Sequence, residues 1–282
     1  MSGASVILSF YNDLPVLKLA LDALAAQHVG QFEVLIADDG SGPEVVSTLE
    51  QLLPQYPFKA THLWHADEGF RKTIILNRAV MQAQSECLIF VDADCVPQQH
   101  FVDDHLRHAG PGICQTGRRI DLFRNAIHEL DCTMPAQLLS RNWAKLLRWS
   151  LQGKARNLEK GLRLPTGLAT RISGRAWGVL GCNFSVNRDD FVQINGFDER
   201  FSVTWGAEDS DPERRLLKAG VQLRSLRYQA TMVHFDGSYF KRRGGQSIRP
   251  ANDHYATVKA EGRIWTAYGI VKVDRPDPVL YS

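Results

Sequence analysis

Residues 87–94 read Cys-Leu-Ile-Phe-Val-Asp-Ala-Asp, an apolar run that ends in two carboxylates one residue apart. A short apolar run bounded by polar residues predicts a buried strand. If the strand continued through Asp92 and Asp94, the two carboxylates would point in opposite directions. A bend at Ala93 would instead let both face one divalent cation and its bound diphosphate. Mg²⁺ and Mn²⁺ prefer oxygen ligands of this kind.

Similar apolar runs occur on both sides of this stretch, separated by segments of helical period. Such alternation predicts βαβ units, a parallel sheet and right-handed crossovers. Ligands of these sheets bind beyond the carboxyl ends of the strands, so the polar residues that follow each strand are candidates for a site. The predicted strands are Val6–Phe10, Phe32–Ala37, Ala60–Trp64, Cys87–Val91 and Ile113–Thr116, and the predicted helices are Leu14–Ala26, Val45–Leu53, Thr73–Ala83 and Phe101–Ala109.

The rest of the chain divides into three further segments within one continuous domain. Residues 1–120 form the alternating half, and residues 121–176 break the alternation with a helical insertion rich in Arg and Lys. Residues 177–243 regain dense turn signals and strand-like runs. Residues 244–282 form a loosely patterned tail.

Composition indicates a globular protein without an anchor. A net charge of +2 gives no reason to expect a nucleic-acid partner. The five cysteines are odd in number and include no Cys-x-x-Cys pair, which favours a reduced, cytoplasmic compartment. The chain enters its first apolar run without a basic stretch, and no apolar run approaches 18 residues, so we expect neither a signal peptide nor a membrane span.

A second acidic motif, Asp38-Asp39-Gly40-Ser41, follows the second predicted strand. Two carboxylates at the carboxyl end of a strand can hydrogen-bond a nucleobase and ribose hydroxyls. They can equally form an Asp-Gly turn that caps the next helix. Both interpretations stay open at this point.

A third motif, Trp205-Gly206-Ala207-Glu208-Asp209, opens a helix predicted over Asp209–Ala219, and His234 ends a later apolar run. Acids at a helix start can simply favour the helix dipole. Alternatively, one of them is a general base that removes a proton from an acceptor hydroxyl. Taken alone, a histidine such as His234 is more often structural than a metal ligand.

Together these motifs resemble glycosyltransferase family 2 of the GT-A fold over roughly residues 4–240. The segment from Gly196 to Asp209 is also similar to the β-1,4-galactosyltransferases, and bacterial chondroitin-type polymerases carry a similar one. The resemblance implies an α/β fold with a doubly wound, mostly parallel sheet flanked by helices. The matching motifs are Val6-Ile7-Leu8-Ser9-Phe10-Tyr11-Asn12, Asp38-Asp39-Gly40-Ser41, Asp92-Ala93-Asp94, Gly181-Cys182-Asn183-Phe184-Ser185 and Gly196-Phe197-Asp198-Glu199.

The resemblance also implies roles for individual residues. Asp94 and His234 would ligate Mn²⁺ or Mg²⁺, Asp209 would be the general base, and Glu208 would hydrogen-bond the acceptor. The implied donor-binding residues are Phe10, Asn12, Asp38, Asp39, Arg71, Lys72, Asp92 and Trp205. Within this set, Asp38 and Asp39 would hold uracil and ribose, Arg71 or Lys72 the diphosphate, and Trp205 the sugar. Asp92 would contact ribose or a metal-bound water.

The implied reaction moves a sugar from a nucleotide-sugar donor, such as a UDP-sugar, to a glycan or lipid-linked glycan in cell-surface polysaccharide or lipopolysaccharide synthesis. Glu208-Asp209 favours inversion at the anomeric carbon, with retention as the alternative. A sugar nucleotidyltransferase would carry a Gly-rich basic loop after the first strand, where this chain has Ser9-Phe10-Tyr11-Asn12-Asp13. A catalytically inactive nucleotide-sugar-binding module should have lost Asp94, Asp209 or His234.

The insertion contains one amphipathic helix. Three interpretations remain: peripheral contact with an anionic membrane at its inner face, a cover for the sheet, or a wall of the acceptor site. Its apolar positions are Leu138, Leu139, Trp143, Leu146, Leu147 and Leu151, and its basic positions are Arg141, Lys145 and Arg148. Further on, Lys241, Arg242 and Arg243 resemble a basic loop that closes over phosphate, or form a solvated turn.

Overall fold

The computed structural model describes residues 3–174, 176, 178–201, 207–235 and 249–272. Its strands are β1 (Ala4–Phe10), β2 (Phe32–Asp38), β3 (Lys59–Trp64), β4 (Cys87–Asp92), β5 (Cys95–Pro97), β6 (Ile113–Thr116), β7 (Arg119–Leu122), β8 (Ala155–Arg156), β9 (Phe184–Asn187), β10 (Gln222–Ser225) and β11 (Met232–Phe235). Its α-helices are α1 (Leu14–Ala25), α2 (Pro43–Leu52), α3 (Lys72–Gln82), α4 (Phe101–Leu106), α5 (Leu138–Leu151), α6 (Thr166–Ile172), α7 (Arg188–Gln193), α8 (Ser210–Lys218) and α9 (Arg249–Glu261). Short 3₁₀ helices are η1 (Leu53–Gln55), η2 (Arg124–Glu129), η3 (Pro135–Gln137) and η4 (Leu158–Gly161).

A central sheet has the strand order β10-β6-β9-β4-β1-β2-β3. Its strands pair in parallel except β9, which runs antiparallel to both β4 and β6. The predicted α/β class with a mostly parallel sheet is therefore confirmed.

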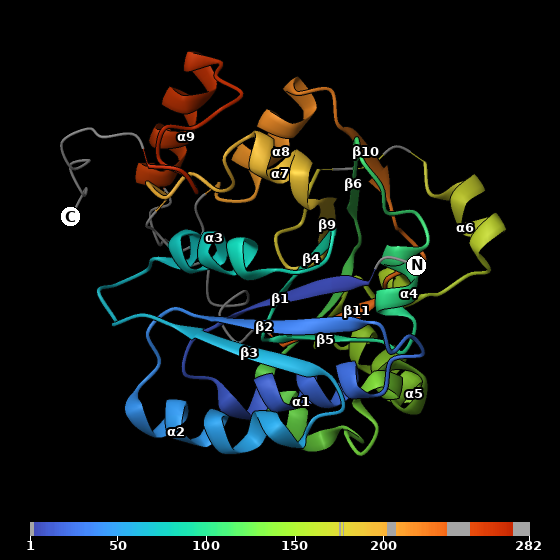
Figure 1. Cartoon of the computed structure of the whole chain (residues 1–282). Helices are drawn as coiled ribbons and strands as arrows, with labels where there is room; N and C mark the ends of the chain where they lie inside the picture. Colours follow the sequence, from blue (N-terminus) through green and yellow to red (C-terminus); the bar gives the residue numbers. More distant parts are fainter. Residues whose placement is uncertain (1–2, 175, 177, 202–206, 236–248, 273–282) are drawn as a thin grey trace.

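Helices cover both faces of this sheet, which explains why its inner strands read as continuous apolar runs. Val6 and Leu8 pack with Leu17 and Leu21 of α1 on one face. Ile7, on the opposite side of β1, belongs to the cluster that packs under α3, α7 and α8. Figure 1 shows α1 and α2 on one side of the sheet and α3, α7 and α8 on the other.

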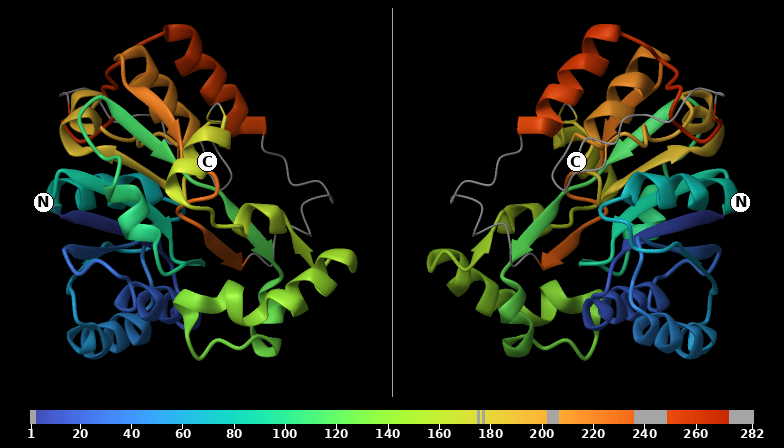
Figure 2. Two further views of the ribbon diagram at one scale, coloured as in Figure 1. Left: turned by 90° about the vertical axis from the view of Figure 1, so that its right-hand side faces the viewer. Right: turned by 90° about the vertical axis from the view of Figure 1, so that its left-hand side faces the viewer.

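A second, smaller sheet has the order β5-β11-β7-β8 and contains parts of the chain that lie far apart in sequence. β11 pairs antiparallel with β5 and parallel with β7. In both views of Figure 2 the green segment that includes α5 lies low in the molecule, beside the blue N-terminal helices. This second sheet sets the position of the metal-ligand candidates described below.

Helix α5 begins and ends at the first and last apolar positions of the predicted pattern and packs most of its apolar side against the second sheet. Leu138, Leu146 and Trp149 are buried in the cluster that covers this sheet. Leu147 and Leu151 are 47% and 92% exposed, so these two positions of the apolar pattern do not join the buried side of the helix. They stand next to the buried positions around the helix but on its solvent side, because the sheet covers only part of the helix circumference.

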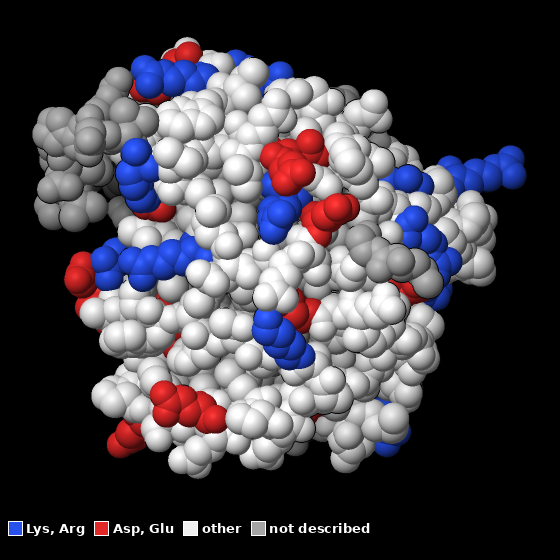
Figure 3. Space-filling view, in the orientation of Figure 1, with Lys and Arg blue, Asp and Glu red and all other residues white. Residues whose placement is uncertain are grey.

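Charged side chains do not gather on the face shown in Figure 3, where Lys and Arg alternate with Asp and Glu in small groups. Within the described ranges, no helix combines the length and the apolar character needed to cross a membrane.

Candidate active site

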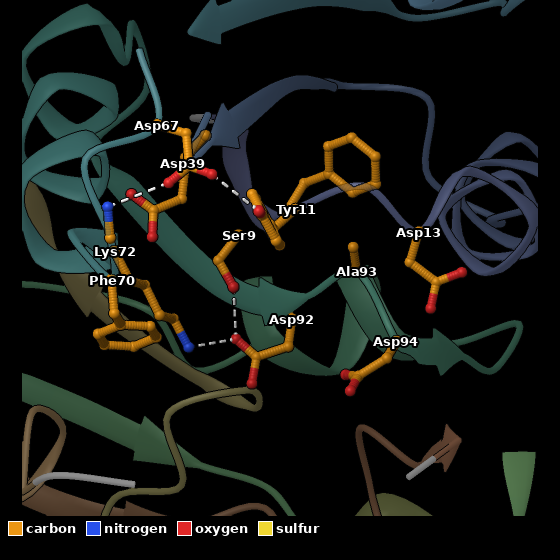
Figure 4. Close-up of a pocket in the computed structure, with 13 residues that line it drawn as sticks. Ser9, Tyr11, Asp13, Asp39, Asp67, Phe70, Lys72, Asp92, Ala93 and Asp94 are labelled. Carbon is orange, nitrogen blue, oxygen red and sulfur yellow. Dashed lines mark hydrogen bonds and ion pairs between the residues drawn. The ribbon is translucent and has the colours of Figure 1, made fainter. Parts of the chain in front are cut away.

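Ala93 and Asp94 form the turn that connects β4 to β5, so the bend expected from the sequence is present. The backbone N–H of Ala93 donates to the carbonyl of Ser9 at 2.9 Å, which carries the β1–β4 pairing to the turn itself. Asp92 and Asp94 line one cavity of about 490 Å³ at the carboxyl ends of β1, β2 and β4. Figure 4 shows both side chains at the wall of this cavity, which we term the reaction pocket.

Asp92 is held by two donors. The Ser9 hydroxyl and the Lys72 ammonium both donate to Oδ1 of Asp92 at 2.6 Å (Figure 4). Burial acts to raise the pKa of Asp92, but the charge and hydrogen bond of Lys72 outweigh it and lower the pKa to about 2. For Lys72, burial acts to lower the pKa, while the charges of Asp92 and Glu208 give a net increase. The pair is therefore ionised at neutral pH and places the Lys72 ammonium, with the Asp92 carboxylate beside it, at the pocket wall.

Asp94 and His234 meet although they are 140 positions apart in sequence, because β11 pairs with β5. His234 Nε2 lies 3.2 Å from Asp94 Oδ2, and His234 Nδ1 lies 3.0 Å from Asp121 Oδ1. Burial acts to lower the pKa of His234, but the hydrogen bonds to the two carboxylates raise it to about 10. Sequence reasoning did not identify Asp121, since only the pairing of β7 with β11 brings it to the histidine.

This group of side chains fits a divalent cation. One ligand atom from each of Asp94, Cys95 and His234 lies within 4.8 Å of the others. A metal-ligating imidazole characteristically uses its other nitrogen to donate to a carboxylate, which is the arrangement of His234 and Asp121. Carboxylate oxygen with imidazole nitrogen suits Mn²⁺, and the carboxylate also suits Mg²⁺.

Asp38 and Asp39 differ in orientation, although both are candidates for donor binding from the sequence. Asp39 lines the reaction pocket, where it accepts from the Arg71 backbone N–H at 3.0 Å and lies 2.7 Å from His65 Nε2. Burial is the main cause that raises the pKa of Asp39. Asp38 is fully buried outside the lining, accepts from the Ser41 backbone N–H at 2.8 Å and lies 2.8 Å from His62. The structure thus places only Asp39 where a ligand can reach it.

The intervening Gly40 allows this turn. Its φ is +99°, and a Cβ at this position would lie 2.6 Å from the Cα of Asp67. Both the backbone conformation and the close approach require glycine. Asp67 in turn accepts from the Tyr11 hydroxyl at 2.9 Å, a pair at the rim of the pocket that the sequence did not suggest (Figure 4).

Of the other donor-binding candidates, Phe10 and Lys72 line the reaction pocket, whereas Asn12 and Arg71 do not. Asn12 adopts a left-handed φ of 56° and its Oδ1 accepts from the Gly42 backbone N–H, so it organises the loop after β1. The Arg71 guanidinium donates to Glu68 and to a backbone carbonyl. Lys72 is thus the basic side chain that faces the pocket.

The two acids before α8 have different surroundings. Asp209 accepts from the Gly181 backbone N–H at 3.1 Å and lies 3.3 Å from the Ser210 hydroxyl. Oε2 of Glu208 is buried and has no hydrogen-bond partner in the described part of the chain. Burial raises the pKa of Glu208 to about 7, against the opposing charge of Lys72. Trp205, Lys241, Arg242 and Arg243 lie outside the described residues.

Comparison with known families agrees with this geometry. Residues 5–124 match the glycosyl transferase family 2 model, and residues 168–236 match that of the N-terminal domain of galactosyltransferase. Together the two matches support assignment to glycosyltransferase family 2, with a galactosyltransferase-like segment. The first match ends with the alternating half, and the second contains Glu208, Asp209 and His234. The resemblance inferred from the motifs is confirmed.

Individual relatives are distant. The chain is 27% identical to an uncharacterized glycosyltransferase of Bacillus subtilis, over 82% of this chain and 64% of that protein. It is 27% identical to the chondroitin synthase of Pasteurella multocida, over 79% of this chain and 24% of that protein. It therefore spans less than two thirds of each. A structure of GalNAc-T7 with UDP, GalNAc and Mn²⁺ has a TM-score of 0.57 at 14% identity, covering 92% of this chain and 48% of that one, which shows a shared fold.

Proposed function

We propose that this family member transfers a sugar from a nucleotide-sugar donor, such as a UDP-sugar, to a carbohydrate acceptor with inversion of configuration. The observation that carries the proposal is the convergence on one pocket of a positive charge, a metal-ligand pair and a nucleobase-side carboxylate. Lys72, Asp39 and Asp94 line the pocket. His234 is not part of the lining and joins the group through its contact with Asp94. The names of the relatives, which include glycosyltransferases and a structure with UDP and Mn²⁺, support the same activity.

Donor binding follows from the chemistry of the pocket walls. Asp39 would accept hydrogen bonds from the nucleobase or ribose, while Phe10 offers an apolar surface close by. Lys72 would face the diphosphate, where a fixed ammonium favours the negative charge that develops as the nucleoside diphosphate departs. Asp94 and His234 would hold Mn²⁺ or Mg²⁺, which when bound supplies further positive charge to the diphosphate.

Proton removal from the acceptor is assigned to Asp209. Its carboxylate is oriented by the Gly181 N–H, so a proton acceptor would be held in one direction before the acceptor arrives. Glu208 has a buried oxygen without a hydrogen-bond partner among the described residues, and this oxygen is suited to receive a hydrogen bond from an acceptor hydroxyl. Attack on the face opposite the leaving group inverts the anomeric carbon.

The acceptor we propose is a glycan or lipid-linked glycan of cell-surface polysaccharide or lipopolysaccharide synthesis, handled in the cytoplasm. The contacts of α5 favour its role as a cover for the second sheet over membrane contact. Arg141 donates to Asp131, and the Lys145 ammonium donates to a backbone carbonyl and lies 5.9 Å from the centre of the Trp149 ring. Two of its three basic side chains are thus engaged within the protein.

The activity can be tested by incubating the protein with separate nucleotide sugars and Mn²⁺, with and without candidate glycan acceptors, and measuring release of the nucleoside diphosphate. We expect release with one or a few donors, at a rate that rises with the correct acceptor. Lys72→Gln should lose most of this release, because the positive charge at the pocket wall is removed. The matched control is Lys18→Gln, which alters an exposed ion pair on α1. Absence of release from every donor would refute the proposal.

A further inference from the structure

A second cavity, of about 500 Å³, lies where η3, the start of α5 and η4 meet the residues after β5. We term it the insertion cavity. The Trp143 side chain lines it while part of the ring packs on the buried cluster beneath α5. The ring is therefore fixed by the core and presents its remaining surface to the cavity.

The side chains of Gln99 and Gln137 contribute two amides to the wall of the insertion cavity. The backbone N–H of Gln99 donates to the carbonyl of Ala136 at 2.9 Å, and the backbone N–H of Gln137 donates to that of Met134 at 2.9 Å. Neither side-chain amide makes a hydrogen bond to the described part of the chain, although both line the cavity. Their neighbour Gln98, by contrast, uses its amide to hold the start of α5 through the Leu139 N–H. A polar wall with fixed backbone and free amides is suited to a ligand.

The cavity wall carries little net charge. The Arg163 guanidinium donates twice to the fully buried carboxylate of Asp104, at 2.8 and 3.1 Å, which balances its charge. Burial, together with the nearby charge of Arg163, lowers the pKa of His100, so its ring is neutral at neutral pH. A phosphate or carboxylate ligand would find no unpaired cation among the lining residues. This favours an uncharged polar ligand.

We propose that the insertion cavity is a second carbohydrate subsite that takes a neutral sugar unit. The apolar C–H face of a pyranose would pack on Trp143, and its hydroxyls would exchange hydrogen bonds with the amides of Gln99 and Gln137. An aromatic ring beside amides matches the two surfaces of a sugar, since each amide both donates and accepts.

The position of the cavity suggests what that sugar belongs to. Thr231, in its wall, precedes β11, and His234 lies three residues further along this strand. Three residues of strand advance about 10 Å, so the cavity and the metal-ligand pair lie at opposite ends of β5 and β11. Resting on the proposed transfer activity, we infer that the subsite holds an acceptor glycan at a unit away from the reacting end.

Binding can be tested without any turnover. Saturation-transfer NMR would use the methyl β-glycosides of glucose, galactose, N-acetylglucosamine and N-acetylgalactosamine at millimolar concentration, with the methyl glucuronide as the charged comparison. At least one neutral glycoside should bind the wild type more tightly than the glucuronide. Gln99→Ala and Gln137→Ala should each weaken its binding about three- to tenfold, as expected for one lost hydrogen bond. Because neither amide supports the fold, these variants should stay folded where Trp143→Ala could unfold the helix.

Two controls separate this subsite from the reaction pocket. Asp94→Asn should keep the glycoside signal, and Ser150→Ala, on the exposed side of α5, should match the wild type. Nucleoside diphosphate release from donor alone should be unchanged in Gln99→Ala and Gln137→Ala, while KM for an oligosaccharide acceptor rises. The inference would be overturned if no neutral glycoside bound, or if the glucuronide bound more tightly than the neutral glycosides. It would also be overturned if Asp94→Asn lost the glycoside signal while the two amide variants kept it. A wild type that binds glycosides but releases no diphosphate would refute the transfer activity and leave the subsite standing.

Discussion

Replacing Glu208 with glutamine should remove a pH-dependent loss of stability. Burial raises the pKa of Glu208 from 4.5 to about 7, so between these values the folded protein keeps a proton that the unfolded chain releases. Stability from this group is therefore unaffected at low pH and falls as the pH rises from 4.5 to about 7. At about 1.36 kcal/mol for each pH unit, the full cost above neutral pH is about 3 kcal/mol. Partial exposure of the side chain favours a value at or below this figure.

The assay is urea unfolding of the wild type and Glu208→Gln, in a chelator, at about pH 5 and about pH 8. The free energy of unfolding of the variant, relative to the wild type, should increase by about 2–3 kcal/mol between the two conditions. Glu50→Gln, an exposed change on α2, is the control and should give a constant difference. A constant difference for Glu208→Gln as well would refute the reasoning, because Glu208 would then not be held in a desolvated, unpaired state.

Four further outcomes are expected. Chelation with EDTA and the substitution Asp94→Ala should each abolish transfer, and added Mn²⁺ should restore the activity of the EDTA-treated wild type but not of the variant. Full turnover in EDTA would contradict the metal assignment. Asp121→Asn should weaken Mn²⁺ binding, measured by calorimetry, about 10–100-fold, because the Asp121 carboxylate orients the His234 ring. The circular dichroism spectrum of this variant should be unchanged. Asp209→Asn should lower kcat on the order of 10²–10⁴-fold without changing the affinity for the donor. Glu208→Gln should mainly raise KM for the acceptor, and the opposite pattern would make Glu208 the general base and Asp209 the acceptor-binding residue. The wild type should not bind anionic vesicles at low salt. If it does bind, and if each replacement of a basic residue of α5 weakens binding by about 1 kcal/mol, the membrane hypothesis is favoured instead.

Local patterns were sufficient for most of the first half of the chain. The predicted strand Ile113–Thr116 has the observed bounds, and Cys87–Val91 differs from β4 by one residue. These runs are buried on both faces, so their apolar character is continuous and easy to recognise. Helix Leu138–Leu151 was likewise readable because its period repeats over several turns. β1, β2 and β3 are neighbours in the sheet, as is usual for consecutive strands joined by short βαβ connections.

The direction of the side chains at the strand ends could not be predicted from local sequence patterns. Asp38 and Asp39 are adjacent acids, yet the φ of Gly40 and the approach of Asp67 turn only Asp39 to the pocket. Arg71 and Lys72 are adjacent bases, yet only Lys72 reaches Asp92. Each choice depends on backbone angles and neighbours that come from other parts of the chain.

By itself, the sequence determined the doubly wound sheet, the family and the acids that follow its strands, because periodicity and short motifs are local. Only the tertiary structure decided that Asp121 supports His234, that Glu208 is buried beside Lys72, and that Trp143 shares a cavity with the amides of Gln99 and Gln137. These contacts join segments that are distant in the chain. The contact between Asp121 and His234 arises from the second sheet, whose strands are too short and too scattered in sequence to have a pattern of their own.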